Sequence, residues 1–317
     1  MHWKIKSYGL VLLLLVACTK PRDATTPEVQ PKVVSYYSTR HLIEAEDLMR
    51  LTKDTSIKII DFRRNKHYQA DHIVGAINLW RSDIESEQYP FGGMMASKLE
   101  MEDLLGKIGL NDNDQVVVYD GVGSCDAARL WWVLKSYGLS NVQILNGGID
   151  AWKKIKGSTD SLLPIPNRSS FKFSSSPLSS SIESEELLSY LNSPGKILLL
   201  DTRSIDEFSG KRQKKGATSG GRIPGAIHID WAENVNSDED GKFKSYKQLA
   251  GLYDPLVQSA DHQIVTYCQT GVRSSLTYFV LTELLGYKNV KNYDGSWSEW
   301  SYKNLPKLQD SVTVVME

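Results

Sequence analysis

One cysteine of this chain has neighbours that could make it a nucleophile. Cys268 opens the segment Cys-Gln-Thr-Gly-Val-Arg, which ends at Arg273 and follows an apolar run at 263–267 that predicts a strand. A loop between a strand and a helix turns backbone N–H groups inwards, and the helix N-terminus adds about half a unit of positive charge. With the charge of Arg273, this setting would lower the pKa of the thiol from about 8.5 to about 3.5–7.5. We therefore predict that Cys268 is a catalytic thiolate; the alternative is a buried structural cysteine, which would need no such loop.

The other two cysteines need separate explanations. Three cysteines in 317 residues are too few for a disulfide scaffold, and no two of them have metal-ligand spacing, so we predict no metal site. Cys125 is interpreted as a small loop residue. A redox or resolving role, including a disulfide with Cys268, is the alternative.

The N-terminus has the features of a lipoprotein signal peptide. Residues 1–17 contain two lysines followed by an apolar core at 10–16, which is too short to span a bilayer. The sequence Leu-Val-Ala-Cys at 15–18 resembles a bacterial lipobox, so we predict cleavage before Cys18 and lipidation of this residue. A plain signal peptide with a chance cysteine is the alternative. Residues 18–37 contain three prolines and little that could pack, which predicts a flexible tether.

These features predict where the mature protein is found. Lipid chains on Cys18 would anchor it to a membrane of the cell envelope. We expect the periplasmic face, with the outer membrane slightly favoured because Thr19 follows the cysteine in place of Asp. The formal net charge of -1 gives no reason to expect a nucleic-acid partner.

The rest of the sequence consists of two similar halves. Residues 116–120 (VVVYD) match 264–268 (IVTYC), residues 59–63 match 199–203, and residues 72–77 match 222–227. Because the period is so long, the repeat is a duplicated domain and not a solenoid.

The repeat defines the domain boundaries. We predict domains at 38–157 and 182–310, joined by a Ser- and Pro-rich linker at 158–181. Asp120 stands where Cys268 stands in the second half, so only the second domain is expected to carry the nucleophile.

Short apolar runs alternate with amphipathic stretches in both halves. Predicted strands lie at 58–61, 115–119, 142–145, 197–200, 263–267 and 290–293, and predicted helices at 100–108, 127–137, 182–191, 246–256 and 274–285. This alternation predicts an α/β fold with two tandem domains, each a mostly parallel sheet flanked by helices.

Together the motifs resemble the tandem-domain family of rhodaneses and mercaptopyruvate sulfurtransferases. The resemblance covers about residues 36–305 and rests on the loop from Cys268 to Arg273, the paired Asp-x-Arg and Ile-x-Gly-Ala-Ile motifs, and the segment at 293–300. It implies a rhodanese-like fold for each domain, with the nucleophile in the second domain alone.

The resemblance also implies a mechanism and a set of site residues. Cys268 would accept the outer sulfur of a small anionic donor as a persulfide and pass it to cyanide or a thiol, without a metal or an organic cofactor. In the family, the arginine of the Asp-x-Arg motif contacts the donor, which suggests Arg203; a salt bridge to Asp201 or Glu207 is the alternative. The expected sulfur-binding loop consists of Gln269, Thr270, Gly271, Val272 and Arg273.

The donor and the reaction class each have competing interpretations. Thiosulfate is the expected donor because Arg273 brings charge to the loop, whereas family members that use mercaptopyruvate have uncharged loops; Gln269, however, is neutral where a typical rhodanese has Arg or Lys. One alternative function is a phosphatase of the same fold, whose signature has five residues between Cys and Arg where this loop has four. The other is a non-catalytic rhodanese-like binding or sensor module.

Overall fold

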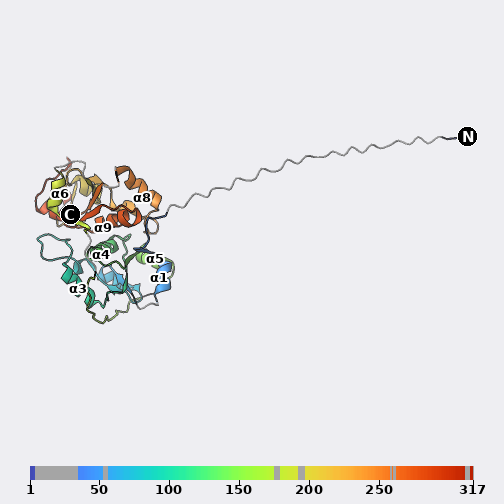
Figure 1. Cartoon of the computed structure of the whole chain (residues 1–317), viewed down its shortest axis with the longest axis horizontal. Helices are drawn as coiled ribbons and strands as arrows, with labels where there is room; N and C mark the ends of the chain where they lie inside the picture. Colours follow the sequence, from blue (N-terminus) through green and yellow to red (C-terminus); the bar gives the residue numbers. More distant parts are fainter. Residues whose placement is uncertain are drawn as a thin grey trace. The chain divides into compact units, whose positions relative to one another are not determined.

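The computed structural model describes residues 1–3, 35–52, 56–174, 179–191, 197–257, 259, 262–310 and 315–316. Most of the predicted signal peptide, Cys18, most of the predicted tether and part of the predicted linker lie outside these residues. The described residues from Ser35 onwards form one compact unit that contains both halves of the repeat (Figure 1). Among the helices that the structure describes, none is long and apolar enough to cross a bilayer.

Each half contains a five-stranded sheet in which all paired neighbours are parallel. The strand order is the same in both. The first sheet runs β1 (Leu42–Ile43), β6 (Val142–Leu145), β5 (Gln115–Tyr119), β2 (Ile57–Asp61) and β4 (Ile77–Asn78), and the second runs β8 (Ser181–Ile182), β13 (Val290–Tyr293), β12 (Gln263–Tyr267), β9 (Ile197–Asp201) and β11 (Ile227–His228). The predicted α/β fold with two tandem domains is confirmed.

Helices cover both faces of the sheets, which is why the central strands are almost wholly apolar. The first half contains α1 (Ala45–Leu51), α2 (Asn65–Ala70), the 3₁₀ turn η1 (Arg81–Asp83), α3 (Lys98–Lys107), α4 (Cys125–Ser136) and α5 (Gly148–Lys154). The second contains α6 (Ser184–Leu191), α7 (Ile205–Ser209), η2 (Trp231–Asn234), α8 (Tyr246–Tyr253), η3 (Asp254–Leu256), α9 (Val272–Phe279), the π-helical turn η4 (Val280–Leu284) and α10 (Ser296–Tyr302). Two small pairs complete the described strands: β3 (His72–Ile73) with β7 (Thr159–Asp160), and β10 (Arg212–Gln213) with β14 (Val315–Met316).

The two halves share one hydrophobic core. α4 of the first half packs against α9 of the second, and the two helices lie next to each other in Figure 1. Trp131 meets Phe279 edge to face, with ring centroids 4.8 Å apart. Because the helices in contact are those that follow Asp120 and Cys268, this packing brings the two corresponding loops towards the same interface.

Several predicted boundaries need correction. Ile182, predicted as the first residue of a helix, forms the edge strand β8 together with Ser181 instead. The predicted linker is partly packed, since Phe171 and Phe173 are buried in the shared core. The predicted helix at 274–285 begins two residues earlier, at Val272, and changes to a π-helical turn at Val280.

Candidate active site

Cys268 follows the central strand β12 and lies just before α9. Gly271 is the N-cap of this helix and has a φ of +75°, a conformation that side chains oppose. A Cβ at this position would lie 2.8 Å from the Asp294 carbonyl oxygen and 2.9 Å from Nη1 of Arg129. The loop is therefore shorter than predicted, and Arg273 lies in the first helical turn.

The sulfur of Cys268 is buried and yet has a lowered pKa. Burial alone raises the pKa, but the charge of Arg273 and the backbone amides of Ser274 and Thr270 outweigh it. The Ser274 hydroxyl also lowers the pKa, and it has no nitrogen or oxygen partner among the residues described. Cys268 is 1% exposed and is a free thiol. A charged sulfur surrounded by fixed donors is the arrangement expected of a nucleophile.

Arg273 is held by a buried carboxylate. Its Nη1 and Nη2 donate to Oε2 and Oε1 of Glu207 at 2.7 and 2.8 Å. Burial would raise the pKa of Glu207, but Arg273 together with the charges of Lys214 and Arg203 lowers it to about 2. Arg273 thus contributes its charge from a fixed position, and Glu207, which the sequence suggested only as a partner of Arg203, is a positioning residue for Arg273. The signal was present: Ser204 and Glu207 have the spacing of a capping box, which the structure contains at the start of α7.

A residue that sequence reasoning missed, Ser296, fixes the loop backbone. Its Oγ accepts hydrogen bonds from the amides of Cys268 and Gly271, both at 3.1 Å, and donates to the Tyr293 carbonyl at 2.7 Å. Ser296 itself has a φ of +52°. The amides of Cys268 and Gly271 thus donate to Ser296, whereas the amides of Thr270 and Ser274 donate to the Cys268 sulfur.

The other predicted loop residues have mainly structural contacts. Gln269 is buried, and its Nε2 donates to Ser298 Oγ at 3.4 Å. Thr270 packs closely under Gly93 of the first half, where a Cβ on the glycine would lie 2.5 Å from that of the threonine. Val272 is buried in the shared core. Apart from the Thr270 amide, these residues shape the loop.

Arg203 forms a salt bridge with Asp201, which was the alternative to a donor-binding role. Its Nε and Nη2 donate to Asp201 at 2.9 and 2.6 Å, Nη2 also donates to the Gly221 carbonyl at 2.7 Å, and the residue is 1% exposed. Arg63 contacts Asp61 in the same way in the half that lacks the nucleophile. Since the motif has the same geometry with or without a cysteine, it ties the strand end together in both halves. A donor-binding role for Arg203 stays a prediction that this geometry disfavours.

The loop of the first half is filled by its own carboxylate. Asp120 Oδ1 accepts the amides of Val122 and Ser124, both at 3.0 Å, and Oδ2 accepts those of Asp126 and Ala127 at 2.7 and 2.9 Å. Four donors that could hold an external anion are thereby occupied.

Cys125, interpreted above as a loop residue, is instead the first residue of α4, and it is a buried free thiol. Burial, followed by the negative charge of Asp126, raises its pKa well above the ordinary value. It therefore lacks the thiolate character of Cys268, and the absence of a nucleophile from the first half stays a prediction.

The first half also holds the active-site loop in place. Arg129 of α4 pairs with Asp294 at 2.6 Å and donates to the Gly93 carbonyl at 2.7 Å. Asp294 in turn accepts the Met95 amide at 2.9 Å. These contacts enclose Gly271, so the domain without a nucleophile is part of the scaffold of the site.

The rhodanese-like domain family model matches residues 44–155 and 183–303. The chain is 38% identical to a Mycobacterium bovis protein provisionally named a thiosulfate sulfurtransferase, covering 74% of this chain and 84% of that protein. It is 31% identical to a Corynebacterium glutamicum thiosulfate sulfurtransferase, covering 85% and 90%. A crystal structure of a 3-mercaptopyruvate sulfotransferase from Escherichia coli has a TM-score of 0.70 at 25% identity, covering 82% of this chain and 99% of that one.

Proposed function

Because this chain belongs to the family of rhodanese-like domain proteins, with one such domain in each half, we propose that it is a sulfurtransferase that works through a Cys268 persulfide. The observation that carries the proposal is a buried free thiol just before α9, surrounded by two amides, a hydroxyl and the charge of Arg273, which together lower its pKa in spite of burial. No organic cofactor or metal enters the proposed reaction.

In the first step, the Cys268 thiolate attacks the outer sulfur of the donor. With thiosulfate, the sulfur–sulfur bond of the donor breaks, sulfite leaves with the bonding electron pair, and the enzyme holds a negatively charged persulfide. The charge stays on sulfur, so the donors that stabilise the thiolate can also stabilise the persulfide.

In the second step, a nucleophilic acceptor removes the outer sulfur. Cyanide attacks that atom, the bond to Sγ breaks, and thiocyanate leaves while the Cys268 thiolate is restored. A thiolate acceptor would leave as its own persulfide. Each step conserves charge and needs no external oxidant or reductant.

The test is thiocyanate formation from thiosulfate and cyanide. We expect Cys268→Ser to abolish it and Cys125→Ser to keep it, since the Cys125 thiol has no charged form at neutral pH to contribute. Thiocyanate formation by the Cys268→Ser variant at the parent rate would overturn the proposal.

Thiosulfate is proposed as the donor on the strength of the named relatives. The structural similarity to a mercaptopyruvate enzyme supports the second candidate donor. Comparing kcat/KM for the two donors separates them, and a preference for mercaptopyruvate would overturn the choice of donor and leave the persulfide mechanism in place.

The two alternative functions make distinct predictions. A phosphatase would release phosphate from p-nitrophenyl phosphate and form no thiocyanate. If the protein is a non-catalytic binding or sensor module, the Cys268→Ser variant should function as well as the parent protein. The four-residue gap between Cys268 and Arg273 supports sulfur transfer over phosphate hydrolysis.

For the mature protein, lipidation of Cys18 and anchoring in the cell envelope are proposed from the N-terminal sequence. Fractionation of cells that express the full chain tests this proposal. The parent protein should be found in the membrane fraction, with the outer membrane favoured. The Cys18→Ser variant should be absent from the membrane fraction. A parent protein found wholly in the soluble fraction would contradict it.

A further inference from the structure

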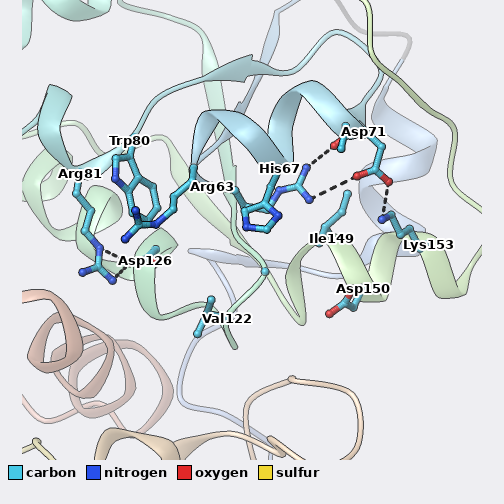
Figure 2. Close-up of a pocket in the computed structure, with 13 residues that line it drawn as sticks. Arg63, His67, Asp71, Trp80, Arg81, Val122, Asp126, Ile149, Asp150 and Lys153 are labelled. Atoms are coloured by element: carbon cyan, nitrogen blue, oxygen red, sulfur yellow. Dashed lines mark hydrogen bonds and ion pairs between the residues drawn. The ribbon is translucent and has the colours of Figure 1, made fainter.

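A cavity lies at the edge of the first sheet, in the domain without a nucleophile. Its volume is about 480 Å³ and its walls come from α2 and the residues that flank it, from Trp80 and Arg81, from the loop after Asp120, and from α5 (Figure 2). Cavities of about 300–1,000 Å³ are typical of small-molecule sites. Cys268 is not among the lining residues, although Arg81 in the wall interacts electrostatically with its sulfur.

Most charges around the cavity are already neutralised. Arg63 is bonded to Asp61, and Lys153 pairs with Asp71 at 2.5 Å. On the opposite wall, Arg81 Nε donates to Asp126 Oδ1 at 2.6 Å. Figure 2 shows the Arg81–Asp126 pair on one side of the cavity and the Asp71–Lys153 pair on the other.

Three charged or polar side chains in the wall lack such a partner. Among the residues described, the side chains of Arg64, His67 and Asp150 make no hydrogen bond or ion pair, although Arg64 has a defined position. Its guanidinium lies 5.3 Å from the centre of the Trp80 ring, and the guanidinium of Arg81 lies at the same distance from that ring. Stacking on an aromatic face fixes a guanidinium without neutralising its charge. The wall therefore presents one fixed cation at the N-cap of α2, an imidazole on α2, and one carboxylate on α5.

The floor of the cavity limits what can bind. The four loop amides that could hold an anion deep in the site are occupied by Asp120. A ligand must be recognised by side chains above the loop, where Ile149 and Val122 offer apolar contact for a carbon skeleton.

We propose that this cavity binds a zwitterionic small molecule of the amino-acid or short acidic peptide class. Its carboxylate lies against Arg64 and His67, and its ammonium group lies against Asp150. A bare sulfur oxyanion would contact Arg64 and His67 and would leave Asp150 without a partner. A zwitterion can contact Asp150 as well, through its ammonium group. The guanidinium fork suits a carboxylate, and each charge-assisted contact adds selectivity.

Isothermal titration calorimetry on the full chain tests the site, with the dipeptide alanyl-glutamate as the probe. Its N-acetyl derivative removes the ammonium group and its diamide removes both carboxylates. We expect the dipeptide to bind and both derivatives to bind at least about tenfold more weakly, since tenfold corresponds to the loss of one contact of about 1.4 kcal/mol. Equal binding of all three compounds, or of none, would overturn the proposal.

Variants locate the binding. Arg64→Gln and Asp150→Asn should each weaken dipeptide binding about tenfold or more. Lys66→Gln, an exposed cation of α2 outside the cavity wall, should leave it unchanged, as should Cys268→Ser. Both cavity positions are exposed, and unchanged thermal unfolding of the variants would establish that they fold. Binding that survives both cavity substitutions, or that is lost in Cys268→Ser, would refute the site.

Discussion

Replacing Glu207 by Gln should cost much of the stability of the second domain at neutral pH. The carboxylate is buried, and its pKa is lowered from 4.5 to about 2, mainly by its two hydrogen bonds with Arg273. A shift of this size corresponds to about 3 kcal/mol, at about 1.4 kcal/mol for each pKa unit. Removing one partner of a buried ion pair typically costs about 3–5 kcal/mol, which agrees.

The pH dependence gives the sign of the effect. Because the pKa of Glu207 is lower in the folded chain than in the unfolded chain, its contribution is fully present above pH 4.5 and is lost as the pH falls through about 2. The difference in unfolding free energy between the parent and Glu207→Gln should therefore shrink across this window.

Urea unfolding at several pH values measures this difference, with Asp206→Asn as the control. Asp206 precedes Glu207 on α7, its side chain is 42% exposed, and among the residues described that side chain contacts only Lys211, at 3.8 Å. This control should change the unfolding free energy by less than about 0.5 kcal/mol. If Glu207→Gln changes the unfolding free energy by less than about 0.5 kcal/mol at neutral pH, the ion pair does not have the stabilising role assigned to it. The same holds if the difference in unfolding free energy between the variant and the parent does not change with pH.

Three further substitutions test the site. Arg273→Gln should move the acid limb of the pH profile of kcat/KM to higher pH, because the charge of Arg273 is the leading influence that lowers the pKa of Cys268; an unmoved limb would contradict this. Ser296→Ala leaves the amides of Cys268 and Gly271 unpaired, which should lower the unfolding free energy by about 1–3 kcal/mol in a denaturant titration. Asp120→Ala leaves four amides unpaired and should cost more than Ser296→Ala in the same titration, without reducing sulfur transfer by Cys268 in the folded protein.

The sequence predicted the features that depend on local pattern. The strands at 115–119, 263–267 and 290–293 were predicted with the bounds that the structure has, because continuous apolar runs between turn residues are typical of central parallel strands. The position of Cys268 between a strand and a helix followed from the same pattern.

Features that depend on distant contacts were missed. Glu207 lies 66 residues from Arg273 in the chain, and Ser296 lies 28 residues from Cys268. The position of Ser296 also depends on a left-handed backbone angle at a serine, which residue preferences do not favour. The β8 edge strand is two residues long and is defined by its pairing with β13. None of these contacts leaves a periodic signal in the sequence.

The two halves show how one fold supports an active and an inactive loop. In both, the loop after the central strand presents amides to a buried anionic group: the Cys268 sulfur in one half and the Asp120 carboxylate in the other. The carboxylate takes four amides and closes the loop, so nothing external can be held there. The sulfur takes two amides and a hydroxyl, and the rest of its stabilisation comes from Arg273, a charge that does not occupy the atom that must react. Catalysis thus requires a loop whose backbone amides stabilise the anion only in part. The remaining stabilisation of the sulfur comes from the charge of Arg273, which Glu207 holds in position.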